Sequence, residues 1–190
     1  MSVKKIAFFA SGSGSNMENI VNNLRAKKLN VEFFLLCNNP QAFVLQRAKN
    51  LGIRAIVFDK KAFNETGEVL NQLKTFQPDL VVLAGFLWLM PVEIIQAFPQ
   101  KIINIHPALL PNYGGKGMYG MHVHKAIVQN KEKESGITIH FVNENYDEGK
   151  YILQALCKLT NEDTPETVAQ KVHLLEFKHF PKVVEDLLKN

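Results

Sequence analysis

The chain has 190 residues, of which 46% are hydrophobic and 21% charged, and its formal net charge is +4. This composition predicts one compact domain over residues 1–190 and excludes extensive disorder. The Lys and Arg residues are scattered rather than clustered, which excludes a nucleic-acid partner and leaves a mild positive charge that suits anionic small molecules.

Short apolar runs alternate with amphipathic segments through the first half of the chain. The apolar runs predict buried strands at Lys5–Ala10, Val31–Cys37, Arg54–Phe58, Asp79–Ala84 and Lys101–Ile105. The segments between them predict helices at Ser15–Lys28, Gln41–Leu51, Lys61–Phe76 and Pro91–Phe98. Strands that alternate with helices pair in parallel and are covered on both faces, so this half predicts a doubly wound sheet.

The later part of the chain has a different pattern. Apolar and polar residues alternate at Gly136–Val142 and at Tyr151–Leu159, which predicts two strands at an antiparallel edge. A C-terminal helix is expected over Thr164–Lys189, broken or kinked at Pro181. The predicted fold class is therefore α/β, with a doubly wound, mostly parallel sheet that has an antiparallel edge.

Cysteine usage and the N-terminal segment bear on the cellular compartment. Cys37 and Cys157 each lie in an apolar run, so we expect buried free thiols in a reducing compartment. The apolar core of the first segment, Ile6–Ala10, is too short for a secretory signal or a membrane span. We therefore predict a cytoplasmic protein with no membrane partner.

A loop rich in glycine and serine, Ala10–Asn16, joins the first predicted strand to the first helix. Glycine lets the backbone approach an anion closely, and N–H groups at a helix start donate to it. The alternative is a tight turn with a Ser or Asn cap. The dinucleotide fingerprint does not fit, because Met17 stands where its third glycine should be, and no Walker Gly-Lys follows. The loop therefore favours a phosphomonoester over a nicotinamide cofactor.

Two polar residues end the fifth predicted strand. Asn104 and His106 are two residues apart, so they face the same side of an extended chain. His106 suits proton transfer near neutral pH, and the Asn104 amide can donate to a developing oxyanion. A hydrogen-bonded structural histidine is the alternative. The loop over residues 142–149 carries three acids, of which one can orient His106 if it reaches the ring, unless all three are simply solvated.

His122 and His124 form a second polar pair. No third ligand stands at a convincing metal spacing, and the two cysteines form no zinc pattern. We therefore expect exposed imidazoles at the start of a helix, and no metal.

Five sequence motifs occur together in this chain: Ser11-Gly-Ser-Gly-Ser-Asn16, Leu83-Ala-Gly-Phe86, Asn104-Ile-His-Pro-Ala-Leu-Leu-Pro111, Gly136-Ile-Thr-Ile-His140 and Asp147-Glu-Gly149. In content and order they resemble the folate-dependent formyltransferase family, over essentially the whole chain. The glycine loop narrows the resemblance to the phosphoribosylglycinamide formyltransferases of purine synthesis. The resemblance implies a formyltransferase-like, Rossmann-like fold.

The resemblance also implies roles for individual residues. The implied catalytic residues are Asn104, His106 and Asp147. The implied binding residues for the acceptor, phosphoribosylglycinamide, are Gly14, Ser15, Asn16, Met17, Glu18, His173 and Glu176. The implied binding residues for the co-substrate, 10-formyltetrahydrofolate, are Leu87, Trp88, Leu89, Met90, Asn104, Asn143, Glu144, Asn145, Tyr146 and Asp147. Plain core packing is an equally good interpretation of the Leu87–Met90 tract.

The implied chemistry is direct formyl transfer between two small molecules, without a metal or a covalent enzyme intermediate, by a monomer or a homodimer. Two features depart from the family pattern. The segment Asn112–Gly120 is several residues longer than the matching segment of the family pattern. The region around Asn64 also lacks an Arg that could contact the folate tail, although Lys60 and Lys61 are close in sequence. Two other functions fit the residues less well: a related folate enzyme with a different acceptor or with water, and a nucleotide-binding module without catalysis.

Overall fold

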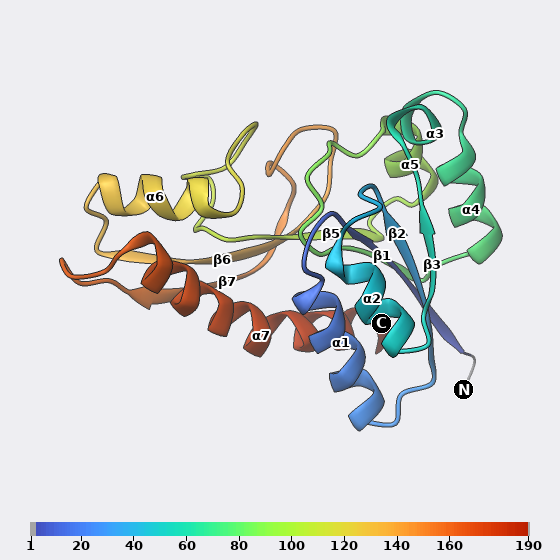
Figure 1. The fold of residues 1–190 in the computed structure, drawn as a ribbon, viewed down its shortest axis with the longest axis horizontal. Coiled ribbons are helices and arrows are strands. Elements are labelled where there is room, and N and C mark those ends of the chain that lie inside the picture. The colour runs from blue at the N-terminus through green and yellow to red at the C-terminus, as the bar shows by residue number, and fades with distance from the viewer. Residues whose placement is uncertain (1–2, 190) are drawn as a thin grey trace.

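The computed structural model describes residues 3–189, so residues 1, 2 and 190 of the predicted domain lie outside the described part. Seven strands form one sheet in the order β3-β2-β1-β4-β5-β6-β7 (Figure 1). The strands are β1 (Lys4–Ala10), β2 (Val31–Cys37), β3 (Arg54–Val57), β4 (Leu80–Leu83), β5 (Ile102–His106), β6 (Glu134–Phe141) and β7 (Tyr151–Lys158). The first five strands pair in parallel, and β6 and β7 add in antiparallel orientation. The expected fold class is confirmed.

Helices cover both faces of this sheet. They are α1 (Ser15–Ala26), α2 (Phe43–Asn50), α3 (Lys60–Asn64), α4 (Glu68–Phe76), α5 (Val92–Ala97), α6 (Met121–Gln129) and α7 (Pro165–Lys189). Phe8 of β1 packs in an apolar cluster with α1, α2, α6 and α7, whereas its neighbour Phe9 packs with α3, α4 and α5. Successive side chains of a strand point to opposite faces, so β1 contributes to both clusters. Figure 1 shows α7 running along β6 and β7 toward α1.

Two predicted helices differ from the structure. The helix expected over Lys61–Phe76 is divided into α3 and α4, because Gly67 adopts a left-handed conformation and begins a new helix. Of the two outcomes predicted at Pro181, a break or a kink, the break is wrong, since α7 continues through it. Proline removes one helical hydrogen bond, and the burial of Phe180, Pro181 and Val184 in the core offsets that loss.

The two cysteines are free, but only one is fully buried. Cys37 of β2 is in the core, whereas Cys157 is only partly covered because β7 is the edge strand. The expectation of a buried thiol is therefore wrong for Cys157. Among residues 3–189, no helix combines the length and the apolar character needed to cross a bilayer.

Candidate active site

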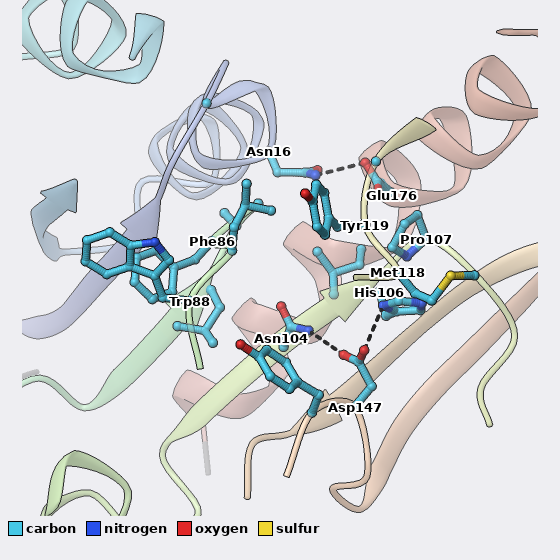
Figure 2. Close-up of a pocket in the computed structure, with 18 of the residues that line it drawn as sticks. Asn16, Phe86, Trp88, Asn104, His106, Pro107, Met118, Tyr119, Asp147 and Glu176 are labelled. Atoms are coloured by element: carbon cyan, nitrogen blue, oxygen red, sulfur yellow. Dashed lines mark hydrogen bonds and ion pairs between the residues drawn. The ribbon is translucent and has the colours of Figure 1, made fainter. Parts of the chain in front are cut away.

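A cavity of about 870 Å³ lies at the carboxyl ends of β1, β4 and β5. This is where an open α/β sheet offers a ligand crevice. Its walls come from the glycine loop, from the segment after β4, from residues 115–121, from the loop before β7, and from α7. Figure 2 shows Asn16 and Glu176 at one end of this cavity and Asn104, His106 and Asp147 at another.

The three predicted catalytic residues are brought together. Asn104 and His106 leave the same side of β5, as their spacing predicted, and Asp147 reaches them from the loop between β6 and β7. The Asp147 carboxylate lies 3.4 Å from His106 Nδ1 and accepts a long hydrogen bond of 3.4 Å from Asn104 Nδ2 (Figure 2). The prediction that a loop acid can orient His106 therefore has a geometric basis, with Asp147 as that acid.

His140 is a fourth member of this cluster that the sequence reasoning left without a role. It stands opposite Asn104 in the β5–β6 register, and its Nδ1 donates to the Phe141 carbonyl at 2.9 Å. Its Nε2 is 3.2 Å from Asn104 Nδ2 and 3.6 Å from Asp147 Oδ1. The sequence pattern that could have pointed to His140 is the alternation along β6, which places the polar side chains of Thr138 and His140 on one face. Both are buried, so this polar face is internal.

The charge state of Asp147 follows from its neighbours. Burial by itself raises the pKa of this carboxyl, but hydrogen bonds from His106 and His140, the charge of His106 and the Gly115 N–H outweigh it. The Asp147 pKa is therefore held well below its usual range. The Gly115 N–H donates to Asp147 Oδ2 at 3.0 Å, so the segment Asn112–Gly120 contacts one of the three predicted catalytic residues directly.

This lowered pKa predicts a pH-dependent contribution to stability. A carboxyl whose pKa falls on folding stabilises the folded state above its unfolded pKa, and the stabilisation is lost as the pH falls through the folded pKa. The free-energy difference between wild type and Asp147→Asn should be largest near neutral pH and shrink as the pH falls below the ordinary value of 3.8. Urea unfolding at a series of pH values measures it. A difference that stays constant into the acid range would contradict the assignment.

Both ring nitrogens of His106 face hydrogen-bond acceptors. Nδ1 faces the Asp147 carboxylate, and Nε2 lies 2.7 Å from the backbone carbonyl of Tyr113. A carbonyl only accepts, so Nε2 carries a hydrogen, and a hydrogen on Nδ1 is needed to satisfy the carboxylate. The arrangement therefore suits a positively charged imidazolium, which is buried with 3% of its surface exposed.

The opposite end of the cavity contains five of the seven predicted acceptor residues. Gly14, Ser15 and Asn16 line it from the start of α1, and His173 and Glu176 line it from α7. Asn16 Nδ2 donates to Glu176 Oε2 at 2.9 Å, and His173 Nδ1 is 3.1 Å from the same oxygen. The Asn16 Oδ1 atom is buried without a partner among the described residues. A buried polar atom without a partner is costly, which marks this position as one that a ligand can satisfy.

The side chains of the other two predicted acceptor residues are directed elsewhere. Met17 is fully buried in the apolar cluster under α1. Glu18 forms an ion pair with Arg47, whose Nε also donates to the Ser13 carbonyl at 2.9 Å. Neither side chain lines the cavity. Arg47 supports the glycine loop from α2, and no sequence pattern pointed to it.

The loop itself is open at the start of α1. Gly14 has φ +75 and is the N-cap residue of α1, so the N-cap position itself has no side chain. The Ser13 hydroxyl accepts only a long hydrogen bond of 3.5 Å from the Ser15 N–H. A Cβ on Gly14 would lie 2.3 Å from Val44 Cγ2, so this glycine also permits the close packing of α2.

The predicted folate tract lines the cavity after β4. Leu87 and Leu89 are exposed, whereas Met90 is buried with the cluster that holds α5. Trp88 packs edge-on against Phe58 at 6.0 Å between ring centroids. Both interpretations of the tract, core packing and a cavity wall, therefore hold in part. Met90 and Trp88 pack in the core, and the exposed Leu87 and Leu89 face the cavity.

The predicted folate loop is divided in the same way. Asn145, Tyr146 and Asp147 line the cavity, while Asn143 and Glu144 do not. Asn143 instead shapes the turn, because its Oδ1 accepts from the Asn145 N–H at 3.1 Å.

The second histidine pair begins α6, as expected, but only His122 is exposed. His124 is buried and lines the cavity, and burial lowers its pKa. The expectation of two exposed imidazoles is therefore wrong for His124, because the inner face of α6 packs on the sheet. Among the described residues, no group of three or more His, Cys, Asp or Glu residues is arranged to hold a metal ion.

The chain is similar in sequence to proteins of one known family. The family model described as formyl transferase matches residues 4–184. Phosphoribosylglycinamide formyltransferase of Bacillus subtilis is 37% identical over 191 residues, which cover 98% of this chain and 95% of that protein. The chloroplastic phosphoribosylglycinamide formyltransferase of Arabidopsis thaliana is 42% identical over 187 residues, or 95% of this chain, and the match spans 64% of that protein's length.

The fold is also similar to that of a solved structure with the same name. The crystal structure of phosphoribosylglycinamide formyltransferase from Bacillus halodurans superposes with a TM-score of 0.87 at 36% identity. The match covers 97% of this chain and 95% of that one.

Proposed function

The chain belongs to the formyl transferase family, whose model matches residues 4–184, and from this premise we propose its reaction. It transfers the formyl group of 10-formyltetrahydrofolate to the glycinamide amine of 5-phosphoribosylglycinamide, a step of purine biosynthesis. The observation that carries the proposal is one cavity that joins a cluster of Asn104, His106 and Asp147 to an open glycine loop. The names of the relatives support formyl transfer to phosphoribosylglycinamide, and the resemblance of the sequence motifs supports the folate donor.

The two substrates would occupy opposite ends of the cavity. The start of α1, at Gly14–Asn16, offers N–H donors and a favourable dipole to the acceptor phosphate. The tract Leu87–Met90 and the loop at Asn145–Asp147 offer apolar and polar walls for the folate ring. In this arrangement the acceptor amine and the formyl carbon would meet beside His106. Holding both reactants in this geometry supplies much of the acceleration.

The proposed reaction is a direct attack. The amine nitrogen bonds to the formyl carbon and gives a tetrahedral intermediate with an oxyanion. The C–N bond to the folate then breaks as a proton passes from the amine to the departing folate nitrogen. The cation on His106 stabilises the oxyanion electrostatically, and Asp147 holds the ring.

The hydrogen bonds of the cluster bear on two steps of this reaction. Asn104 Nδ2 faces both His140 and Asp147, at 3.2 and 3.4 Å, and must release one of these long contacts to donate to the oxyanion. Both nitrogens of His106 are also engaged. Proton transfer through a water molecule therefore fits the geometry better than transfer through His106.

One assay separates the proposal from its two competitors. Folate deformylation is followed spectroscopically with and without the phosphoribosyl amine. The proposed transferase deformylates only when the acceptor is present and forms the N-formyl product. A formyl hydrolase deformylates without the acceptor, and a nucleotide-binding module does not deformylate at all.

The acceptor end can be tested with Asn16→Ala. Removing the amide releases Glu176 and should weaken binding of the phosphoribosyl amine about 10-fold or more, since hydrogen bonds to charged groups contribute about 1.5–3 kcal/mol. Binding of a folate analogue should be unchanged. Calorimetric titration with each ligand measures both affinities.

A matched control lies one turn further along α1. Asn19 donates to the Phe177 carbonyl at 2.9 Å and does not line the cavity, so Asn19→Ala should leave both affinities unchanged. Equal weakening of both ligands by Asn16→Ala would count against the acceptor assignment. Gly14→Val is a poor probe, because the clash with Val44 disturbs packing as well.

We also propose that residues 1–190 act as one domain, because both apolar clusters share the seven-stranded sheet. The cytoplasmic location and the choice between monomer and homodimer remain predictions from the sequence.

A further inference from the structure

Tyr113 connects the catalytic histidine to a surface cluster outside the cavity. Its backbone carbonyl lies 2.7 Å from His106 Nε2. Its own backbone has a φ of 58°, in the left-handed region that residues other than glycine seldom adopt. A conformation of this kind persists only where the surroundings hold it.

The Tyr113 hydroxyl is held by two side chains that follow α6. It donates to Glu132 Oε1 at 2.6 Å and accepts from Asn130 Nδ2 at 2.8 Å. The ring also packs against the apolar cluster that contains α6. Glu132 and Asn130 do not line the cavity, so neither is placed to touch a substrate.

We propose that Tyr113 is a positioning residue for His106, held in place by Glu132 and Asn130. This inference rests on the proposed formyl transfer. The hydroxyl contacts fix the ring, the ring fixes the backbone, and the backbone carbonyl fixes the Nε2–H of His106. Together with Asp147 on Nδ1, this carbonyl holds the imidazolium between two acceptors. The ring then cannot turn away from the formyl group as negative charge develops there.

The test compares two changes that break this contact with one that preserves it. Glu132→Ala and Tyr113→Phe each remove the hydrogen bond between the hydroxyl and the carboxylate. Each should lower kcat roughly 10- to 100-fold with both KM values unchanged, because a misplacement of about 1 Å can cost about 100-fold. Glu132→Gln keeps an oxygen acceptor for the hydroxyl and should retain most of the activity. The double variant should be no slower than either single variant.

Glu134→Ala is the matched control, since Glu134 is an exposed glutamate two residues along the chain. It should leave kcat unchanged. An unchanged or increased kcat in both test variants would overturn the proposal. So would a rise in KM at constant kcat, because the segment would then act on substrate binding.

A second readout does not depend on activity. The ¹⁵N signals of the His106 ring report which nitrogens carry hydrogen. We expect the wild-type Nε2 signal to be that of a nitrogen that carries a hydrogen, because it faces the Tyr113 carbonyl. We expect this signal to move in Glu132→Ala but not in Glu134→Ala. An unmoved Nε2 signal would overturn the proposal. If the wild-type protein failed to transfer formyl, the proposed function would fail while this measurement still decided whether Glu132 acts on His106.

Discussion

Replacing His106 by alanine is expected to lower kcat by roughly 10²- to 10³-fold, the usual cost of losing one group that stabilises a developing oxyanion. The structure adds a specific reason. His106 is buried against the Asp147 carboxylate, so its removal takes away the positive charge beside the developing oxyanion. Steady-state kinetics with both substrates measures the loss. His122→Ala, which removes an exposed histidine that does not line the cavity, is the control and should retain full activity.

The double variant His106→Ala with Asp147→Asn decides how Asp147 acts. If Asp147 works by holding His106, the double variant should be little slower than His106→Ala alone, because residues that act as a unit do not give additive losses. Fully multiplicative losses would refute this coupling. Asp147 would then have a separate role, such as shaping the loop through its contact with the Gly115 N–H.

Gly149→Ala is expected to damage both folding and catalysis. A Cβ at this buried position would lie 1.6 Å from the Phe141 carbonyl oxygen, which belongs to the backbone and cannot give way by rotating. Overpacking of this kind typically costs about 1–3 kcal/mol of stability or more. The loop that carries Asp147 must shift to relieve the clash, so kcat should fall as well.

Urea unfolding and formyl-transfer kinetics measure the two effects. Gly12→Ala is the control for stability, because a Cβ there meets nothing within 4 Å and the backbone has an ordinary φ. Its unfolding midpoint should match wild type. An unchanged midpoint for Gly149→Ala would show that the hairpin between β6 and β7 can absorb the methyl group.

Local pattern predicted much of the fold. The bounds of β2 match the predicted strand, because Val31–Cys37 is apolar apart from Glu32 and has clear ends. The two-residue spacing of Asn104 and His106 predicted their common side, since alternation is a property of the strand itself. The division of the helix at Gly67 was missed because one left-handed glycine interrupts an otherwise helical pattern.

The site was less accessible to sequence reasoning, because its key contacts join distant residues. Spacing and residue chemistry singled out Asn104 and His106, and the resemblance to known formyltransferases added Asp147. His140 joins them only through the antiparallel register of β5 and β6. Strand alternation cannot state which residues of two strands stand opposite each other. The carbonyl of Tyr113 was invisible for another reason: a backbone atom carries no signature in the sequence.

The order of the strands also bears on how the chain folds as it is synthesised. Strand β1 lies between β2 and β4. Its edge toward β2 can pair once the chain has been made as far as Cys37, whereas its edge toward β4 stays unpaired until Leu83 has been made. Strand β5, which carries Asn104 and His106, then adds beside β4, and β6 and α7 follow later still. Domains form more slowly when contacts join residues far apart in sequence. Strand β1 therefore presents an unpaired apolar edge until β4 has been made, and the cavity is complete only after α7 has been synthesised.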